Sequence, residues 1–413
     1  MNSKPINRMR TILFSCLVFI AVGCQDSVEL PEYLTYYHSD LLNKAKDNLN
    51  EENSSCLRTA YNQLISSADE LLEEPCPSVV QKKRVPPSGN KHDYISVGPY
   101  WWPDTTKPDG LPYIRRDGEL NPDYYSDDTD HASLRKMLEM GETLTMAYYF
   151  SGKEKYAEKA SICLRVWFLD EETRMNPHLR FGQAIPGLNN GRFTGIIETR
   201  HLGRIGDLVN ILLNSEHWNQ EDHEKMKTWF EQYLDWLVHS DFGIQEAGWP
   251  NSHGTWFDVQ ASGMAQLTGK QELAREILEE VKTRRLDKQL TPQGGQPHEL
   301  ERIKSLSHSI MNLRGYYHLG FMAEHEGIDL WQYKTVDNPG IKGATDFLVQ
   351  HALKNEWPYQ QMGETAPLKE DLVELLFLAK NVYDTKEYDV YINDLKNKNC
   401  DNWEILLFNG YKY

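Results

Sequence analysis

The chain has 413 residues, of which 40% are hydrophobic, and it carries a formal net charge of −17 at pH 7. This length and hydrophobic content suffice for one large domain or two ordinary ones with a sizeable core. The acidic excess argues against nucleic acid as a partner, because nucleic acid presents dense negative phosphates. An anionic substrate would need a locally basic site, since exposed charges more than about 10 Å away are largely screened at physiological salt.

The first 23 residues form a predicted targeting segment. Lys4, Arg8 and Arg10 precede the apolar run TILFSCLVFIAVG, which is short for a membrane span. The run ends in AVGC, which is typical of a bacterial lipoprotein cleavage box. We therefore expect an exported lipoprotein, periplasmic or anchored in the outer membrane by lipidation of Cys24, with residues 24–54 as a tether and N-terminal segment. The alternative is a plain secretory signal in which Cys24 is incidental.

Four further cysteines follow Cys24, and their spacing resembles no metal motif. They are Cys56, Cys76, Cys163 and Cys400. A Cys56–Cys76 disulfide is possible in an exported protein, but we favour buried free thiols for several of them. No metal site and no cofactor are predicted.

From residue 55 onward the apolar periodicity is mostly helical. Helices are expected over residues 131–152, 155–170, 194–213, 222–238, 256–267, 271–284, 305–324, 343–353 and 368–380. Short polar connectors separate them, and the sequence shows no strict repeat, no βαβ alternation and no phosphate-binding glycine loop. The pattern predicts a single all-α domain over 55–413, an α/α toroid or incomplete barrel of helical hairpins with long loop insertions.

Three long stretches without helical periodicity, 84–130, 176–202 and 289–308, are the best places to look for function. The first offers aromatic rings for stacking on sugars and arginines for binding carboxylates, namely Tyr100, Trp101, Trp102, Arg115 and Arg116. The second offers Asn176, His178, Gln183, Arg192, Arg200 and His201, and the third Gln296, Glu299, Arg302 and His308.

Each of these candidates also has an ordinary structural explanation. Trp101 and Trp102 could anchor their own loop. Arg115 and Arg116 could pair with Asp109 or Asp117 at the surface. Arg200 and His201 could belong to a buried polar network. The acidic run DDTD at 127–130 is expected to be a solvated helix cap, formed by Asp128 or Asp130.

The stretch WPNSHGTWFDVQ, residues 249–260, places His253 between Trp249 and Trp256. A histidine in this setting is either a working imidazole or a hydrogen-bonded structural residue beside core aromatics. Trp256 is a further candidate for stacking on a sugar. The stretch alone does not decide between these interpretations.

These stretches, above all YWWPDTTKPDGLPYIRRDGELNP and NSHGTW, resemble the α/α-toroid alginate lyase superfamily, and specifically polysaccharide lyase family thirty-eight. The resemblance runs from about Asp93 to Glu324, over half the chain. It implies β-elimination on a 4-linked uronate polymer of the alginate or glucuronan type, without a metal, leaving an unsaturated uronate end. The expected partner is an anionic uronate polysaccharide or oligosaccharide, and the membrane is contacted only through the lipid anchor.

The chemistry of β-elimination explains why the resemblance matters. The C5 proton of a uronate becomes acidic enough only if the neighbouring carboxylate is neutralised, and an acid must then protonate the departing O4. By resemblance His253, Asn251 and Arg302 match family positions, and Gln296 and Glu299 fit the local pattern. Glu299 lies three residues before Arg302, so on a helical turn the two would face the same way and Glu299 could orient the guanidinium.

Three positions depart from the family pattern. Ser252 stands where a second asparagine is expected, Phe257 where a tyrosine is common, and His308 where the catalytic tyrosine is expected. An imidazole can transfer protons, so His308 is interpreted as the replacement, with activity that persists below neutral pH. If the register is wrong, Tyr316 or Tyr317 could supply the phenol.

Two other classes of function remain open from the sequence. A glycoside hydrolase on the same toroid would need two carboxylates across a cleft, for which Asp130, Glu198 and Glu299 are possible. A surface glycan-binding lipoprotein would keep the aromatic and basic residues and lose the base, as the change at His308 suggests.

Overall fold

The computed structural model describes residues 28–49, 51, 55–396, 400 and 402–408. The predicted signal peptide and the predicted lipidation site, Cys24, lie outside these residues. Within the described ranges, no helix combines the length and the apolar character that a membrane crossing requires.

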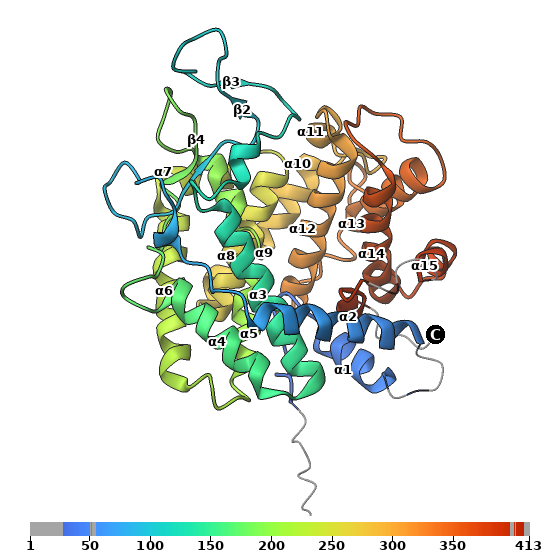
Figure 1. Ribbon diagram of the computed structural model, residues 1–413. Helices are drawn as coiled ribbons and strands as arrows, with labels where there is room; N and C mark the ends of the chain where they lie inside the picture. Colours follow the sequence, from blue (N-terminus) through green and yellow to red (C-terminus); the bar gives the residue numbers. More distant parts are fainter. Residues whose placement is uncertain (1–27, 50, 52–54, 397–399, 401, 409–413) are drawn as a thin grey trace, which may run out of the picture.

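The described chain is mostly helical, and its helices pack as neighbouring hairpins (Figure 1), which confirms the predicted α/α toroid. The helices are α1 (Ser39–Asn48), α2 (Ser55–Leu72), α3 (His131–Ser151), α4 (Glu154–Phe168), α5 (Arg204–Leu212), α6 (Gln220–His239), α7 (Asp241–Ala247), α8 (Ser252–Leu267), α9 (Gln271–Val281), α10 (Asp287–Gln289), α11 (Pro297–Leu300), α12 (Ser305–His325), α13 (Gly340–Leu348), α14 (Ala366–Tyr383), α15 (Asp389–Lys396) and α16 (Ile405–Phe408). α3 packs on α4, and α8 packs on α9 and α12.

Four short strands lie in the loop-rich stretches. β1 (Ile95–Val97) pairs in parallel with β4 (Phe181–Ala184), and β2 (Trp101–Trp102) pairs antiparallel with β3 (Ile114–Arg115). Figure 1 shows the β2–β3 hairpin, β4, α7 and α11 gathered at one end of the helical assembly. These elements carry five of the residues singled out in the sequence, namely Trp101, Trp102, Arg115, Gln183 and Glu299.

The helix expected over 194–213 is interrupted. Its first part is the 3-10 helix η3 (Phe193–Thr199), and α5 starts only at Arg204. Between them the backbone of Gly203 lies against the ring of Tyr36, where a Cβ atom would come within 2.3 Å of the ring. The N-terminal segment therefore packs on this turn, and the backbone amides of Thr35, Tyr36 and Tyr37 donate to the buried carboxylate of Asp207.

The cysteines are paired differently from the expectation. Cys56 is bonded to Cys400, and Cys76 to Cys163, so neither a Cys56–Cys76 bridge nor free thiols are found at these positions. The first bridge joins α2 to the C-terminal segment, 344 residues away in sequence. Partners this distant cannot be inferred from local spacing.

The cap predicted in the DDTD run is not solvated. Asp130 occupies the N-cap position of α3 without a side-chain capping bond and is fully buried. Its carboxylate accepts from the amide of Ile95 and lies 3.0 Å from the ammonium of Lys82. Burial raises the pKa of Asp130 to about 7, and the charge of Lys82 opposes this rise. The group thus ties α3 to β1.

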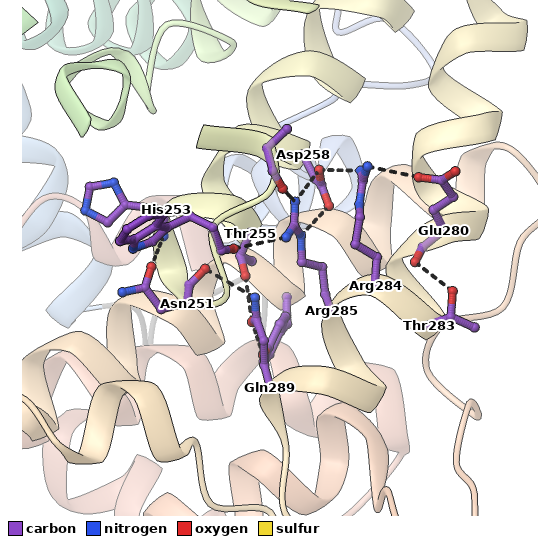
Figure 2. A network of polar contacts seen from close by, with 12 residues as sticks. Asn251, His253, Thr255, Asp258, Glu280, Thr283, Arg284, Arg285 and Gln289 are labelled. Atoms are coloured by element: carbon purple, nitrogen blue, oxygen red, sulfur yellow. Dashed lines mark hydrogen bonds and ion pairs between the residues drawn. The ribbon is translucent and has the colours of Figure 1, made fainter. Parts of the chain in front are cut away.

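α8 is buried on almost every face, so its polar side chains need internal partners. Figure 2 shows the result: Asp258 binds Arg284 and Arg285, and Thr255 donates to Gln289. The Asp258–Arg285 pair is almost completely inaccessible to solvent, with contacts of 2.7 and 3.0 Å. Phe257, where a tyrosine is common in the family that the sequence resembles, is also buried.

We expect Asp258→Ala to lower the free energy of unfolding by about 3–5 kcal/mol, because it leaves the buried Arg285 guanidinium without its counter-ion. Denaturant titration of the variant measures this loss. Glu280→Gln, which removes an exposed partner of Arg284, is the matched control and should cost at most about 1 kcal/mol. Equal stability of the two variants would contradict the prediction.

Candidate active site

His253 lies in the first turn of α8 and is paired with a buried carboxylate. Its Nδ1 is 2.7 Å from Oε1 of Glu246, which belongs to α7 and is fully buried. A carboxylate beside Nδ1 favours the tautomer that carries the proton there, which leaves Nε2 as an acceptor. Figure 2 shows the imidazole turned away from the polar network beneath α8. Glu246 therefore orients the imidazole of His253.

The N-terminus of α8 is held by two side chains. The amide oxygen of Asn251 accepts from the backbone N–H of His253 at 3.0 Å, which leaves its NH2 group to donate to a ligand. Glu299 accepts from the backbone N–H of Ser252 at 2.6 Å. Glu299 thus caps α8, and its orientation of Arg302 stays a prediction. The backbone angle at His253 is fixed before any substrate arrives.

Arg302 faces the β2–β3 hairpin. Its guanidinium lies 3.9 Å from the carboxylate of Asp117, which also accepts from Arg115 at 2.8 Å. Lys304 lies nearby, with its ammonium 5.7 Å from the centre of the Tyr100 ring. Burial raises the pKa of the Tyr100 phenol, and the charge of Arg302 opposes this effect. The hairpin thus brings a phenol and a carboxylate to the arginine.

His308, in the first turn of α12, lies close enough to Arg302 and His253 for the charges of both to act on its imidazole. Burial above all, together with the charges of Arg302 and His253, lowers its pKa to about 3. The imidazole of His308 is therefore neutral at any ordinary working pH. The structure thus brings together three of the sequence candidates, His253, Arg302 and His308, with Tyr100 beside them.

Arg192 forms another part of the same surface. It donates to the backbone and side-chain oxygens of Gln183 at 3.0 and 2.9 Å, and its guanidinium lies 5.8 Å from the centre of the Trp101 ring. Gln183 has a φ of 49°, which is uncommon for a residue with a side chain. The charge of Glu246 raises the pKa of Arg192, although burial lowers it more. Arg192 is therefore close to the His253–Glu246 pair.

Trp249 presents an aromatic surface beside this group. Its side chain is 41% exposed, and its ring centre lies 4.9 Å from that of Phe193. Trp249 lies between α7, which ends at Ala247, and Asn251, the N-cap of α8, so it is held at the same end of the fold as His253. An exposed ring in this position can stack on a sugar.

The β2–β3 hairpin uses several of its candidate residues for itself. The indole N–H of Trp102 donates to the backbone of Glu119, and Arg116 lies over the Trp102 ring at 5.3 Å. Arg116 also lies 3.7 Å from the carboxylate of Glu119. Trp101 pairs across the hairpin with Arg115. Trp102 and Arg116 thus stabilise the hairpin, while Trp101 and Arg115 lie on the side of Arg192.

Several sequence candidates lie elsewhere. Trp256 is fully buried and donates to the backbone of Met311, which leaves no ring face for a sugar. Gln296 is buried and bonded to Ser309 and Asn312. Asn176 and His178 both contact Asp93.

The remaining candidates are also displaced from His253. Arg200 and His201 line a separate cavity. Tyr316 and Tyr317 are buried, with hydroxyls bonded to Gln289 and Thr345, so neither can supply a phenol to the site.

The carboxylates considered for a hydrolase are engaged inside the protein. Asp130 pairs with Lys82, and Glu299 caps α8. Glu198 accepts from Tyr94 and Ser96 at 2.7 and 2.6 Å. In the described part of the chain, no group of three or more histidine, cysteine or acidic side chains is arranged to hold a metal ion.

Sequence reasoning missed Glu246, Lys304 and the contact between Asp117 and Arg302. Glu246 stands in a different helix from His253, so no helical spacing links the two. The one feature of the sequence that could have indicated Glu246 is its place as an acidic residue shortly before the histidine motif. Asp117 was considered only as a surface partner of Arg115 and Arg116.

Comparison with known proteins gives a consistent result. The chain matches the alginate lyase family over residues 78–357. It is 37% identical to an alginate lyase from Bacteroides ovatus of known crystal structure, over 91% of this chain and 98% of that chain, with a TM-score of 0.86. Comparison with curated proteins gives no match.

More distant structures share the fold alone. Alginate lyase A1-III from Sphingomonas species A1 is 15% identical, over 94% of this chain and 98% of that chain, with a TM-score of 0.57. A variant of A1-III complexed with a tetrasaccharide has the same identity and coverage and a TM-score of 0.58.

Proposed function

The chain belongs to the alginate lyase family and is a polysaccharide lyase, and we propose that it cleaves alginate, a 4-linked uronate polymer, by metal-independent β-elimination. The observation that carries this proposal is the His253–Glu246 pair next to Arg302 and His308. The tetrasaccharide complex of the A1-III variant supports an anionic oligosaccharide as the ligand. We further propose that the protein acts after export, anchored through Cys24.

The substrate carboxylate is neutralised by donors that converge on it. Arg302 supplies a planar guanidinium that can bind both carboxylate oxygens. The NH2 group of Asn251 and an N–H of the neutral His308 add two uncharged donors. Together they stabilise the negative charge that develops when the C5 proton leaves. Asp117 must release Arg302 for this to happen, because the substrate carboxylate takes its place.

His253 takes the C5 proton at Nε2. Glu246 holds the Nδ1 proton at 2.7 Å and stabilises the imidazolium that forms. His308 is a poor base by comparison, because a group whose pKa is lowered to about 3 has little affinity for a proton. The role expected for His308 from the sequence is thus reassigned from proton transfer to carboxylate binding.

Tyr100 is the phenol beside Arg302, and it donates a proton to the departing O4. Burial raises its pKa, so the phenol stays protonated throughout the working range. Loss of the bond between O4 and C4 then leaves an unsaturated uronate at the new end. Trp249, Trp101 and Arg192 bind neighbouring sugar units.

The direct test is absorbance of the unsaturated uronate during incubation of the mature protein with alginate and, separately, with glucuronan. A rise on alginate supports the proposal. New reducing ends without absorbance would mean hydrolysis, and binding without either product would mean a glycan-binding protein. Either of the last two outcomes overturns the proposed reaction.

We expect Arg302→Lys to lower kcat/KM on alginate by about 10²-fold, because lysine lacks the planar pair of donors. Initial rates at several polymer concentrations measure the effect. Arg116→Lys, in the same hairpin region but stacked on Trp102, is the control and should stay within a few-fold of the parent. Full activity of Arg302→Lys would show that a diffuse positive charge is sufficient there.

A further inference from the structure

A second cavity lies apart from the His253 group, between α3, η3 and the C-terminal segment. Its volume is about 550 Å³. Ligand pockets for small molecules commonly measure about 300–1000 Å³, so this space can admit a short saccharide. Neither His253, Arg302 nor His308 lines it.

Two arginines of this cavity lack a carboxylate partner within the described ranges. Arg200 donates one bond to the backbone oxygen of Ile197, at 3.2 Å, and burial lowers its pKa. Arg135, at the mouth, donates to the hydroxyl of Tyr125 at 3.2 Å. A guanidinium carries five N–H donors, so most of the hydrogen-bonding capacity of Arg200 is unused by these contacts. A desolvated cation with spare donors favours an anion.

Two of the carboxylates in the wall are already engaged. Glu142 binds the guanidinium of Arg204 and accepts from the hydroxyl of Tyr37. Glu198 accepts from Tyr94 and Ser96, and burial raises its pKa to about 7, so much of its charge is absent near neutral pH. Burial also raises the pKa of Glu404.

Glu139 also lines the cavity, and its exposed carboxylate lies 3.6 Å from the ammonium of Lys136. The repulsion that an incoming anion meets is therefore smaller than the number of acidic residues suggests.

Aromatic rings stand beside the two arginines. The ring of Tyr124 stacks on His131, with centres 3.8 Å apart, and Tyr125 lies edge-on to Tyr124. Tyr125 is 42% exposed, and Arg135 lies 5.4 Å from its ring centre. Nδ1 of His131 is buried without a hydrogen-bond partner in the described residues. Flat rings next to guanidinium groups suit a pyranose that carries a carboxylate.

We propose that this cavity is a second binding site for a short uronate oligosaccharide, with Arg200 and Arg135 on carboxylates and Tyr125 on a ring face. The identity of the anion as a uronate rests on the proposed function, whereas the binding of a carboxylate-bearing sugar rests on the cavity alone. The site is separate from the group that performs elimination and needs no residue of that group.

The experiment is calorimetric titration of a mannuronate trisaccharide into a variant that carries both His253→Ala and Arg302→Gln, which removes the proposed base and the carboxylate-binding arginine and so weakens binding at the reaction centre. We expect binding to persist and to weaken at least 10-fold on adding Arg135→Gln or Arg200→Gln. Arg275→Gln, which removes the same charge from an exposed position on α9, is the matched control and should not change it. Tyr125→Ala at the mouth provides a surface variant if Arg200→Gln fails to fold.

Two results would overturn the proposal. One is that the variant with His253→Ala and Arg302→Gln binds no trisaccharide. The other is that adding Arg135→Gln or Tyr125→Ala leaves the affinity of that variant unchanged. Cellotriose, a neutral trisaccharide, should not bind, and equal binding of it would also overturn the role of the arginines. Activity of the parent protein on alginate, followed by absorbance, is a separate readout. If the parent protein is inactive but the cavity binds uronate, the proposed function fails and the second site stands. If the parent protein is active but the cavity binds nothing, the second site fails and the proposed function stands.

Discussion

Glu246→Gln is expected to lower kcat on alginate by about 10³-fold while KM changes only a few-fold. Glu246 accepts the Nδ1 proton of His253 at 2.7 Å, which leaves Nε2 free to accept the C5 proton. A glutamine amide can instead donate to Nδ1, and the imidazole then carries its proton on Nε2, where it cannot act as a base. The substitution also removes the negative charge that stabilises the imidazolium. Loss of tautomer control of this kind costs several orders of magnitude in turnover.

A structural role for Glu246 would give a different set of results. Glu246→Asp keeps the charge and should recover part of kcat, although its shorter side chain lengthens the contact. The Glu246→Gln and His253→Ala variants should not be additive, because the two residues act as one unit. If the Glu246→Gln protein melts like the parent and its kcat stays within a few-fold, His253 does not depend on the carboxylate. If the activity of Glu246→Gln falls only in proportion to a loss of thermal stability, the role of Glu246 is in packing and not in catalysis.

The helices were the most predictable part of the fold, because their signal is local. The segment 131–152 carries apolar residues at helical spacing and ends at a glycine, and α3 spans His131–Ser151 with Gly152 at a φ of 68°. The break between η3 and α5 has no local signal. It depends on Gly203 meeting the ring of Tyr36, which comes from the distant N-terminal segment.

The candidate site was predictable to the extent that it lies in motifs. His253, Arg302 and His308 stand in recognisable stretches, and the fold brings them together. Glu246 comes from a neighbouring helix, and its importance follows only from its burial and its contact with Nδ1. Trp256 shows the opposite error. Its position near His253 in sequence suggested a sugar platform, but the helical turn directs it into the core.

The change of the expected tyrosine to His308 leads to the last prediction. His308→Gln is expected to lower kcat/KM by about 10²-fold without changing the shape of its pH profile between about pH 4 and 9. Burial, with the charges of Arg302 and His253, lowers the pKa of His308 to about 3. The imidazole is therefore uncharged above that pH, and glutamine in its place alters no charge in this range. The loss reflects one hydrogen-bond donor to the substrate carboxylate.

The competing interpretation, that His308 is the base which replaces the tyrosine, makes a different prediction for the same measurement. An essential base with a pKa near the unperturbed histidine value of about 6.5 would give an acid limb that vanishes with His308→Gln. Rates from pH 4 to 9, normalised to the maximum of each protein, distinguish the two. His308→Tyr adds a phenol near Arg302, and because a phenol must lose its proton to act as a base, any activity it contributes should grow toward alkaline pH. A parent profile with a limb near 6.5 that is absent from His308→Gln would return the base to His308 and leave His253 with the carboxylate.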